Sequence, residues 1–170
     1  MKRISPNLRK VLAVAFAILF ASAYGIAQDN YITIADGPWS SAEIWSIDGF
    51  EACDCSPPVN ISNSEVTIRH EVSSASNIHV KSEGILIIDL DGSLLMSDKE
   101  LNVQAGSLYS FGYMHLGGLE VGNAGYAMIA APAVIEDKFL VLGTVDLQFA
   151  TYDTLKIMAA DMHINPGAVF

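Results

Sequence analysis

The chain has 170 residues, a formal net charge of −10 and a hydrophobic fraction of 51%. Its nine Lys and Arg residues are too few, and beyond Lys10 too scattered, to bind nucleic acid or an anionic membrane surface, because phosphate groups are bound by clustered basic side chains. The length is enough for one domain with its own hydrophobic core.

The first 27 residues are typical of an export signal. Four basic residues up to Lys10 precede an uncharged apolar run over residues 11–23, and small residues follow. We expect cleavage after Ala27, with Ala23 as the alternative. Because all 19 acidic residues lie beyond Ala27, the mature chain keeps five basic residues and a charge of −14. The alternative is an uncleaved anchor, but the run is shorter than the about 20 residues that span a bilayer. We therefore expect a secreted or cell-surface protein without membrane contact after cleavage.

Residues 28–65 are rich in turn signals and are predicted to form an irregular N-terminal cap. Both tryptophans, Trp39 and Trp45, lie in this segment. They are candidates for stacking on a sugar ring, but paired tryptophans at the open end of a repeat stack more often cover its first turn. Cys53 and Cys55 flank one residue, and export makes a disulfide between them chemically feasible. We interpret this pair as a loop clip, since two cysteines are too few for a zinc site.

From residue 66 to the end, short segments alternate between apolar and polar positions. The pattern glycine, any residue, apolar, any residue, apolar begins at Gly92, Gly117 and Gly143, and Gly167 opens it a fourth time, so that the steps are 25, 26 and 24 residues. A fixed period in this range is typical of a solenoid, in which each turn buries its inner face against the next.

Two further tracks of apolar segments complete the repeat. One contains Ile78, Leu101 and Tyr126, and the other contains Leu86, Leu108, Val134 and Leu155. Three tracks predict an all-β fold, a right-handed parallel β-helix (β-solenoid) of about four to five turns over residues 66–170. The alternative, an antiparallel β-sandwich, would show turn signals about every 8–12 residues. Since residues 162–170 read as the start of another turn, we expect the stack to be incomplete or covered there, for example by end-to-end self-association.

Glu120 and Asp146 are the candidate ligand residues. Each lies three residues after a glycine of the repeat, so the predicted register stacks them one turn apart, at about 4.8 Å. Two carboxylates at that spacing can hold Ca²⁺ or act as an acid and a base on a glycan. The alternative is that both are ordinary surface carboxylates.

Other chemistry-bearing patterns are weak. Asp89-Leu90-Asp91-Gly92 opens like a calcium loop but lacks the ligands that should follow. The four histidines are too far apart in the sequence to form a local metal pair, and neither a nucleophile elbow nor a phosphate-binding glycine loop is present. We therefore expect no metal or cofactor, with Ca²⁺ as the one candidate.

The sequence also carries a family resemblance. Trp39-Ser40-Ser41-Ala42, then Trp45-Ser46, a proline-containing loop, residues 66–72 and residues 78–86 resemble the start of secreted bacterial β-helix surface proteins of the kind found in Bacteroidetes. The chain is similar, over about residues 35–170, to the extracellular domain family named for its eight glycines. The resemblance implies a β-helix with a tryptophan-rich cap and does not imply an activity.

Together these observations predict a secreted, non-enzymatic module that adheres to a glycan or a surface protein. The alternatives are the non-catalytic N-terminal part of a polysaccharide-degrading β-helix enzyme and a structural spacer. A strip of outward aromatic side chains would favour glycan binding, and Tyr109, Tyr113 and Tyr126 are the candidates for such a strip.

Overall fold

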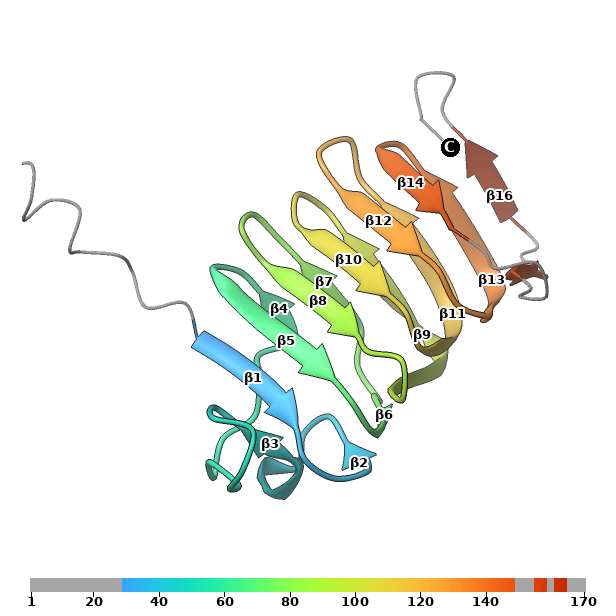
Figure 1. Cartoon of the computed structure of the whole chain (residues 1–170). Coiled ribbons are helices and arrows are strands. Elements are labelled where there is room, and N and C mark those ends of the chain that lie inside the picture. Colours follow the sequence, from blue (N-terminus) through green and yellow to red (C-terminus); the bar gives the residue numbers. More distant parts are fainter. Residues whose placement is uncertain (1–28, 149–154, 159–160, 165–170) are drawn as a thin grey trace, which may run out of the picture.

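The protein is a β-solenoid of about five turns whose parallel strands stack along one axis (Figure 1). The computed structural model describes residues 29–148, 155–158 and 161–164. This architecture confirms the predicted all-β solenoid. The expected export signal and the repeat that begins at Gly167 lie outside the described residues.

Sheet A has seven strands in the spatial order β14-β12-β10-β8-β5-β1-β3. Its strands are β1 (Asp29–Thr33), β3 (Trp45–Ser46), β5 (Ser64–Ile68), β8 (Ile85–Ile88), β10 (Ser107–Ser110), β12 (Tyr126–Ile129) and β14 (Thr144–Leu147). Neighbours are parallel except for β1 and β3, which pair antiparallel at the N-terminal edge. Each turn of the solenoid therefore adds one strand to this sheet.

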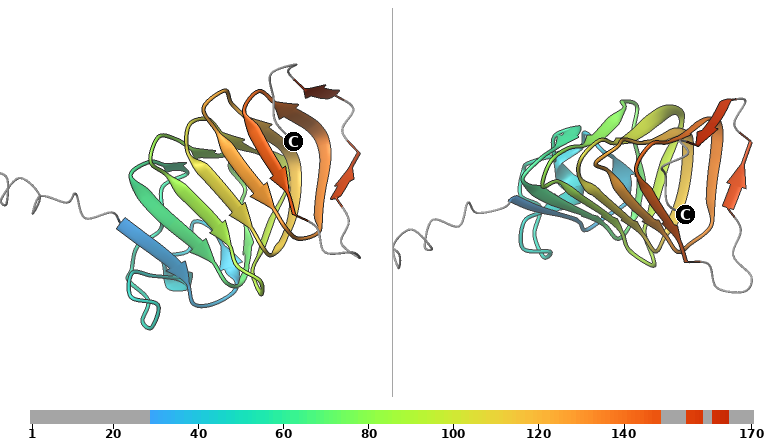
Figure 2. Two further views of the ribbon diagram at one scale, coloured as in Figure 1. Left: turned by 45° about the horizontal axis from the view of Figure 1, so that its top comes forward. Right: turned by 90° about the horizontal axis from the view of Figure 1, so that it is seen from above.

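Sheet B supplies the other two faces of the solenoid. Its strands are β2 (Gly37–Pro38), β4 (Asn60–Ile61), β6 (Glu71–Ser73), β7 (Ile78–Val80), β9 (Ser93–Val103), β11 (Tyr113–Val121), β13 (Ala133–Val141), β15 (Leu155–Ile157) and β16 (Asp161–Ile164). The first residues of β9 pair with β6 and its last residues pair with β7. In β11 the register is interrupted between Leu116 and Gly118, which separates the two halves. The cross-section thus has three sides, as the three tracks predict (Figure 2).

The core runs along the inside of the stack. On sheet A, one inward register position carries an apolar residue without solvent exposure in five successive strands: Val66, Leu86, Leu108, Ala127 and Val145. The burial of alternate residues in β8, β10 and β12 follows from the period of two of a β-strand. Because each turn buries its inward side chains against the turns on either side, the apolar contact is continuous along the axis.

The glycines that stack from turn to turn differ from those that the sequence period suggested. A ladder precedes β8, β10, β12 and β14 and consists of Gly84, Gly106, Gly125 and Gly143. The carbonyl oxygens of the first three accept hydrogen bonds from the backbone N–H groups of Ser107, Tyr126 and Thr144. A Cβ atom on Gly106 would overlap the carbonyl oxygens of Lys81 and Gly84, so the backbones approach too closely for any other residue.

The predicted register is therefore wrong in part. Gly92 directly precedes β9 in sheet B and Gly117 lies inside β11, so neither stacks on Gly143. Within the other two tracks, Ile78 does pair with Leu101 and Leu86 with Leu108. Beyond those pairs, the tracks cross from one sheet to the other.

The N-terminal segment closes one end of the core. It contains a single 3-10 turn, η1 (Ala42–Ile44), and both tryptophans. Trp45 is 0% exposed and Trp39 is 4% exposed, and their ring centroids are 5.1 Å apart in an edge-to-face arrangement. Each indole N–H donates to a backbone carbonyl, that of Trp45 to Trp39 and that of Trp39 to Pro57, both at 2.9 Å. The suggestion that these rings stack on a sugar is wrong, because they are buried as the cap of the solenoid.

The loop between β3 and β4 extends from this cap. Cys53 and Cys55 are joined by a disulfide across Asp54, whose φ is +51°. Before it, the Asp48 Oδ1 atom accepts hydrogen bonds from the Ser46 hydroxyl and from the backbone N–H of Phe50. These bonds, that from Phe50 first, hold the pKa of Asp48 below its ordinary value. Local hydrogen bonds and the covalent link thus shape a loop whose phenyl ring, Phe50, is 85% exposed.

Candidate functional site

Glu120 and Asp146 do not form the predicted pair. Glu120 lies on β11 in sheet B, where its register neighbours are Asn102 and Leu140. Asp146 lies on β14 in sheet A, in register with Met128. The two carboxylates are therefore on different sheets, and neither a calcium site nor an acid and base pair can be built from them.

Glu120 belongs instead to a closed ionic cluster on the outside of sheet B. The Lys138 ammonium donates to the Glu120 carboxylate at 2.8 Å and lies 3.4 Å from the Glu100 carboxylate. The hydrogen bond to Glu120 is the main cause that raises the pKa of Lys138, and the charge of Glu100 adds to it against an opposing effect of burial. Lys138 therefore stays protonated at neutral pH and is not a candidate general base.

The described residues offer no cluster suited to a metal ion. Within residues 29–148, 155–158 and 161–164, no group of three or more His, Cys, Asp or Glu residues is arranged to hold one. Asp89, in the calcium-loop-like segment, accepts a hydrogen bond from the N–H of Leu90 and lies 3.6 Å from the Arg69 guanidinium. His115 is occupied by Glu136 at 2.8 Å. These groups form local structural contacts.

A different set of side chains stands out on the outside of sheet A. Its outward positions on three successive strands carry large apolar or aromatic residues that are partly exposed, and we call this set the aromatic platform. The platform consists of Ile85 and Ile87 from β8, Tyr109 from β10, Phe111 directly after it, and Tyr126 and Met128 from β12. The register places Ile87 beside Tyr109 and Tyr109 beside Met128. Partly exposed apolar groups gathered in this way typically mark a binding surface.

Two tyrosines form the centre of the platform. The ring centroids of Tyr109 and Tyr126 are 5.8 Å apart with an angle of 53° between the ring planes, a tilted arrangement in the favourable range for aromatic pairs. Burial, followed by the negative charge of Asp146, raises the pKa of the Tyr126 hydroxyl above its ordinary value of 10.0. The hydroxyl therefore stays protonated at neutral pH and can donate a hydrogen bond.

Polar groups border the platform on the next turn. Asp146 follows Met128 in register on β14, and its Oδ2 atom accepts a hydrogen bond of 2.8 Å from the amide of Gln148. The carboxylate keeps a second oxygen and the amide keeps its carbonyl and a second N–H for other partners. Asp146, predicted for the wrong partner, thus stands beside a surface suited to a ligand.

The sequence identified part of this surface. Tyr109 and Tyr126 were expected as members of an aromatic strip, and the structure brings them together. Tyr113 does not join them, because it begins β11 in sheet B, where it is 38% exposed and pairs with Ser93. The isoleucines were missed, although a detectable signal was present: in Ile85-Leu86-Ile87-Ile88 both sides of the strand are apolar, so one side has to face outward.

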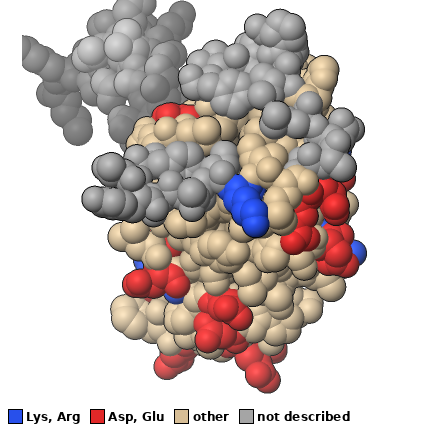
Figure 3. Space-filling model, turned by 90° about the vertical axis from the view of Figure 1, so that its right-hand side faces the viewer, with Lys and Arg blue, Asp and Glu red and all other residues tan. Residues whose placement is uncertain are grey.

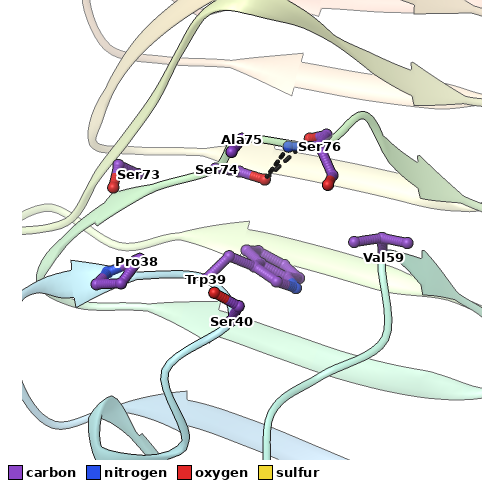
Figure 4. Close-up of a pocket in the computed structure, with 8 residues that line it drawn as sticks. All are labelled: Pro38, Trp39, Ser40, Val59, Ser73, Ser74, Ala75 and Ser76. Atoms are coloured by element: carbon purple, nitrogen blue, oxygen red, sulfur yellow. Dashed lines mark hydrogen bonds between the residues drawn. The ribbon is translucent and has the colours of Figure 1, made fainter.

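A second hollow lies against the cap. Trp39, Val59 and Ser73 to Ser76 line a pocket of about 150 Å³, in which the Ser74 hydroxyl donates to the carbonyl of Ser76 at 2.9 Å (Figure 4). This volume is below the range of about 300–1,000 Å³ that is usual for small-molecule sites. Because the hydroxyl is engaged and the indole is buried, this pocket is a weaker candidate than the platform.

The described surface is acidic and has large uncharged areas. In the view from the C-terminal end of the stack, acidic side chains gather in several places and basic ones are few (Figure 3). Among the residues that the structure describes, no helix has the length and apolar character to cross a membrane.

Comparisons with protein-family models, with curated proteins and with solved structures gave no match for this chain. The function is therefore inferred from the site itself.

Proposed function

We propose that this protein is an exported, non-enzymatic β-solenoid module that binds a glycan through the aromatic platform of sheet A. The observation that carries the proposal is the Tyr109–Tyr126 pair, with Asp146 and Gln148 on the adjacent turn. Aromatic faces carry negative charge density and attract the weakly positive C–H groups of a sugar ring. A carboxylate and an amide beside the rings supply acceptors and donors for hydroxyl groups.

The compartment in this proposal follows from the chain itself. The basic and apolar start of the sequence is the reason to expect export. The disulfide between Cys53 and Cys55 suits an oxidising environment outside the cytoplasm. As part of the same proposal, we place the protein at a cell surface or in the extracellular medium, in line with its resemblance to bacterial surface β-helix proteins.

Affinity electrophoresis tests the proposal. The purified protein is run in native gels that contain hydroxyethylcellulose, xylan or mannan, and we expect at least one of these neutral polymers to retard it. Replacing Tyr109 and Tyr126 by alanine should weaken retardation by about tenfold or more, since aromatic anchors dominate binding energy. Tyr113→Ala is the matched control, because this tyrosine is exposed on the other sheet.

Two results would contradict the proposal. In one, none of the gels retards the wild-type protein. In the other, Tyr113→Ala weakens retardation as much as the double variant does. Thermal unfolding of all variants, recorded in parallel, shows whether a loss of binding comes from a loss of the fold.

A further inference from the structure

We propose that the ligand is an uncharged linear polysaccharide that lies along the axis of the stack, across β8, β10, β12 and β14. This inference rests on the proposed function and names the class and the direction of its ligand. It has three parts: the shape of the face, the distribution of its side chains and its charge.

The face of sheet A is longer along the axis than along its strands. β8, β10, β12 and β14 each have four residues, so the face is about 14 Å wide at about 3.4 Å per residue. Turns that begin at Gly84 and Asp89 bound β8 on its two sides. Along the axis, the six parallel strands from β1 to β14 are about 4.8 Å apart, which gives about 24 Å. An extended polymer can keep contact with this face over its greatest length only if it crosses the strands.

The side chains of the platform are distributed in the same direction. β8 contributes Ile87, β10 contributes Tyr109 and β12 contributes Tyr126, so that each turn offers one large side chain or more. The platform then continues into the polar pair of Asp146 and Gln148 on β14. A ligand confined to one strand would meet a single tyrosine, whereas a ligand along the axis meets both tyrosines and the polar pair.

The charges of the face select against acidic polymers. Among the outward residues that the structure describes from β5 to β14, the acidic ones are Glu65, Asp89 and Asp146 and the basic one is Arg69, which lies 3.6 Å from Asp89. Uronic acid and sulfated chains would be repelled by this face and by the net charge of −10. A cationic polymer would be attracted by the whole acidic surface in a salt-dependent way, and the platform would not be required.

Calorimetric titration with a series of oligosaccharides tests the inference. The probes are neutral β-1,4-linked oligomers from the disaccharide to the hexasaccharide, of the backbone that retards the protein most in gels, with polygalacturonate as the acidic probe. We expect the hexasaccharide to bind about tenfold or more tightly than the disaccharide, because it contacts more turns. Affinity should change little with salt, since uncharged ligands are not screened.

Variants at the two ends of the platform give the direction. Ile87→Ser on β8 and Gln148→Ala after β14 should each weaken hexasaccharide binding severalfold and leave disaccharide binding on the tyrosine pair unchanged. Leu95→Ser is the matched control, because Leu95 is a partly buried outward leucine on β9 in sheet B. Thermal unfolding of each variant separates a loss of contact from a loss of the fold.

The possible failures are distinguishable. If Tyr109→Ala weakens binding but the hexasaccharide binds no better than the disaccharide, or if the end variants have no effect, the axial direction is wrong and the proposed function survives. Binding of polygalacturonate at equal strength would overturn the uncharged class alone. If neither Tyr109→Ala nor Tyr126→Ala changes the affinity, the proposed function fails together with this inference.

Discussion

The outer faces of sheet A and sheet B are built on the same turns, yet their side chains are arranged in opposite ways. On sheet B, Lys138 bridges the carboxylates of Glu100 and Glu120, and His115 pairs with Glu136. On sheet A, Tyr109 and Tyr126 leave partly exposed rings beside Asp146. Sheet B thus satisfies its polar groups internally, whereas sheet A leaves apolar and polar groups available. In a solenoid the inward positions determine the fold, so each outer face is free to differ.

An inward substitution breaks this comparison, because it affects both faces together. Leu108 is fully buried on β10, next to Tyr109. We expect Leu108→Ala to lower the free energy of unfolding by about 2–5 kcal/mol, through lost burial and the cavity left behind. Urea denaturation measures the loss. Leu140→Ala, at a partly exposed outward position of β13, is the control with the same chemical change. An equal effect of both substitutions would contradict the assignment of inside and outside.

The glycine ladder is tested by a second matched pair. Gly106→Ala places a Cβ atom against the carbonyl oxygens of Lys81 and Gly84, and we expect a loss of about 1–3 kcal/mol because backbone atoms have to move. In Gly118→Ala the nearest atoms are in the side chains of Glu100 and Lys138, at 3.0 and 3.3 Å, which can adjust. That change should alter stability by about 1 kcal/mol or less. The urea midpoints of the two variants should differ clearly, and a reversed order would disprove the ladder.

The ionic cluster of sheet B has a smaller expected effect. Lys138→Met should lower stability at neutral pH by up to about 1 kcal/mol, since its partners are partly exposed to solvent. Lys99→Met is the control: Lys99 pairs at 2.8 Å with Asp98, its neighbour in sequence, and the unfolded chain retains such a contact.

The pH dependence of Lys138 has a defined sign. Its pKa is raised in the folded protein, so its contribution is complete below the unfolded value of about 10.5 and is lost as the pH rises through the higher folded value. The difference in urea midpoint between wild type and Lys138→Met should therefore be constant near neutral pH and disappear well above pH 10.5. A difference that vanishes on acidification from pH 8 to pH 6 would contradict this assignment.

The sequence predicted the solenoid because its local alternation survives any change of register. Leu86 and Leu108 were aligned correctly because a short turn of regular composition joins them. The register was lost elsewhere because the turns vary in length: paired residues are 23 apart from Ile78 to Leu101 and only 18 apart from Leu101 to Leu119. A constant period between these values cannot follow such variation.

The candidate site was predictable only in part for the same reason. Glu120 and Asp146 share a local pattern after a glycine, but corners of the solenoid recur on every side, and the pattern does not say which side it belongs to. Tyr109 and Tyr126 were recognised by residue type alone, and their contact depends on the pairing of β10 with β12. The ion pairs of Lys138 depend on a register that the sequence period misassigned.

The most direct test of the central claim is to map a bound oligosaccharide by the backbone amide signals of the labelled protein in nuclear magnetic resonance spectra. The probe is the neutral hexasaccharide that binds most tightly in calorimetry. The account predicts that shifted signals lie on β8, β10, β12 and β14 and that the signals around Glu120 and Lys138 on sheet B stay in place. Shifts confined to sheet B, or to the pocket beside Trp39, would contradict it.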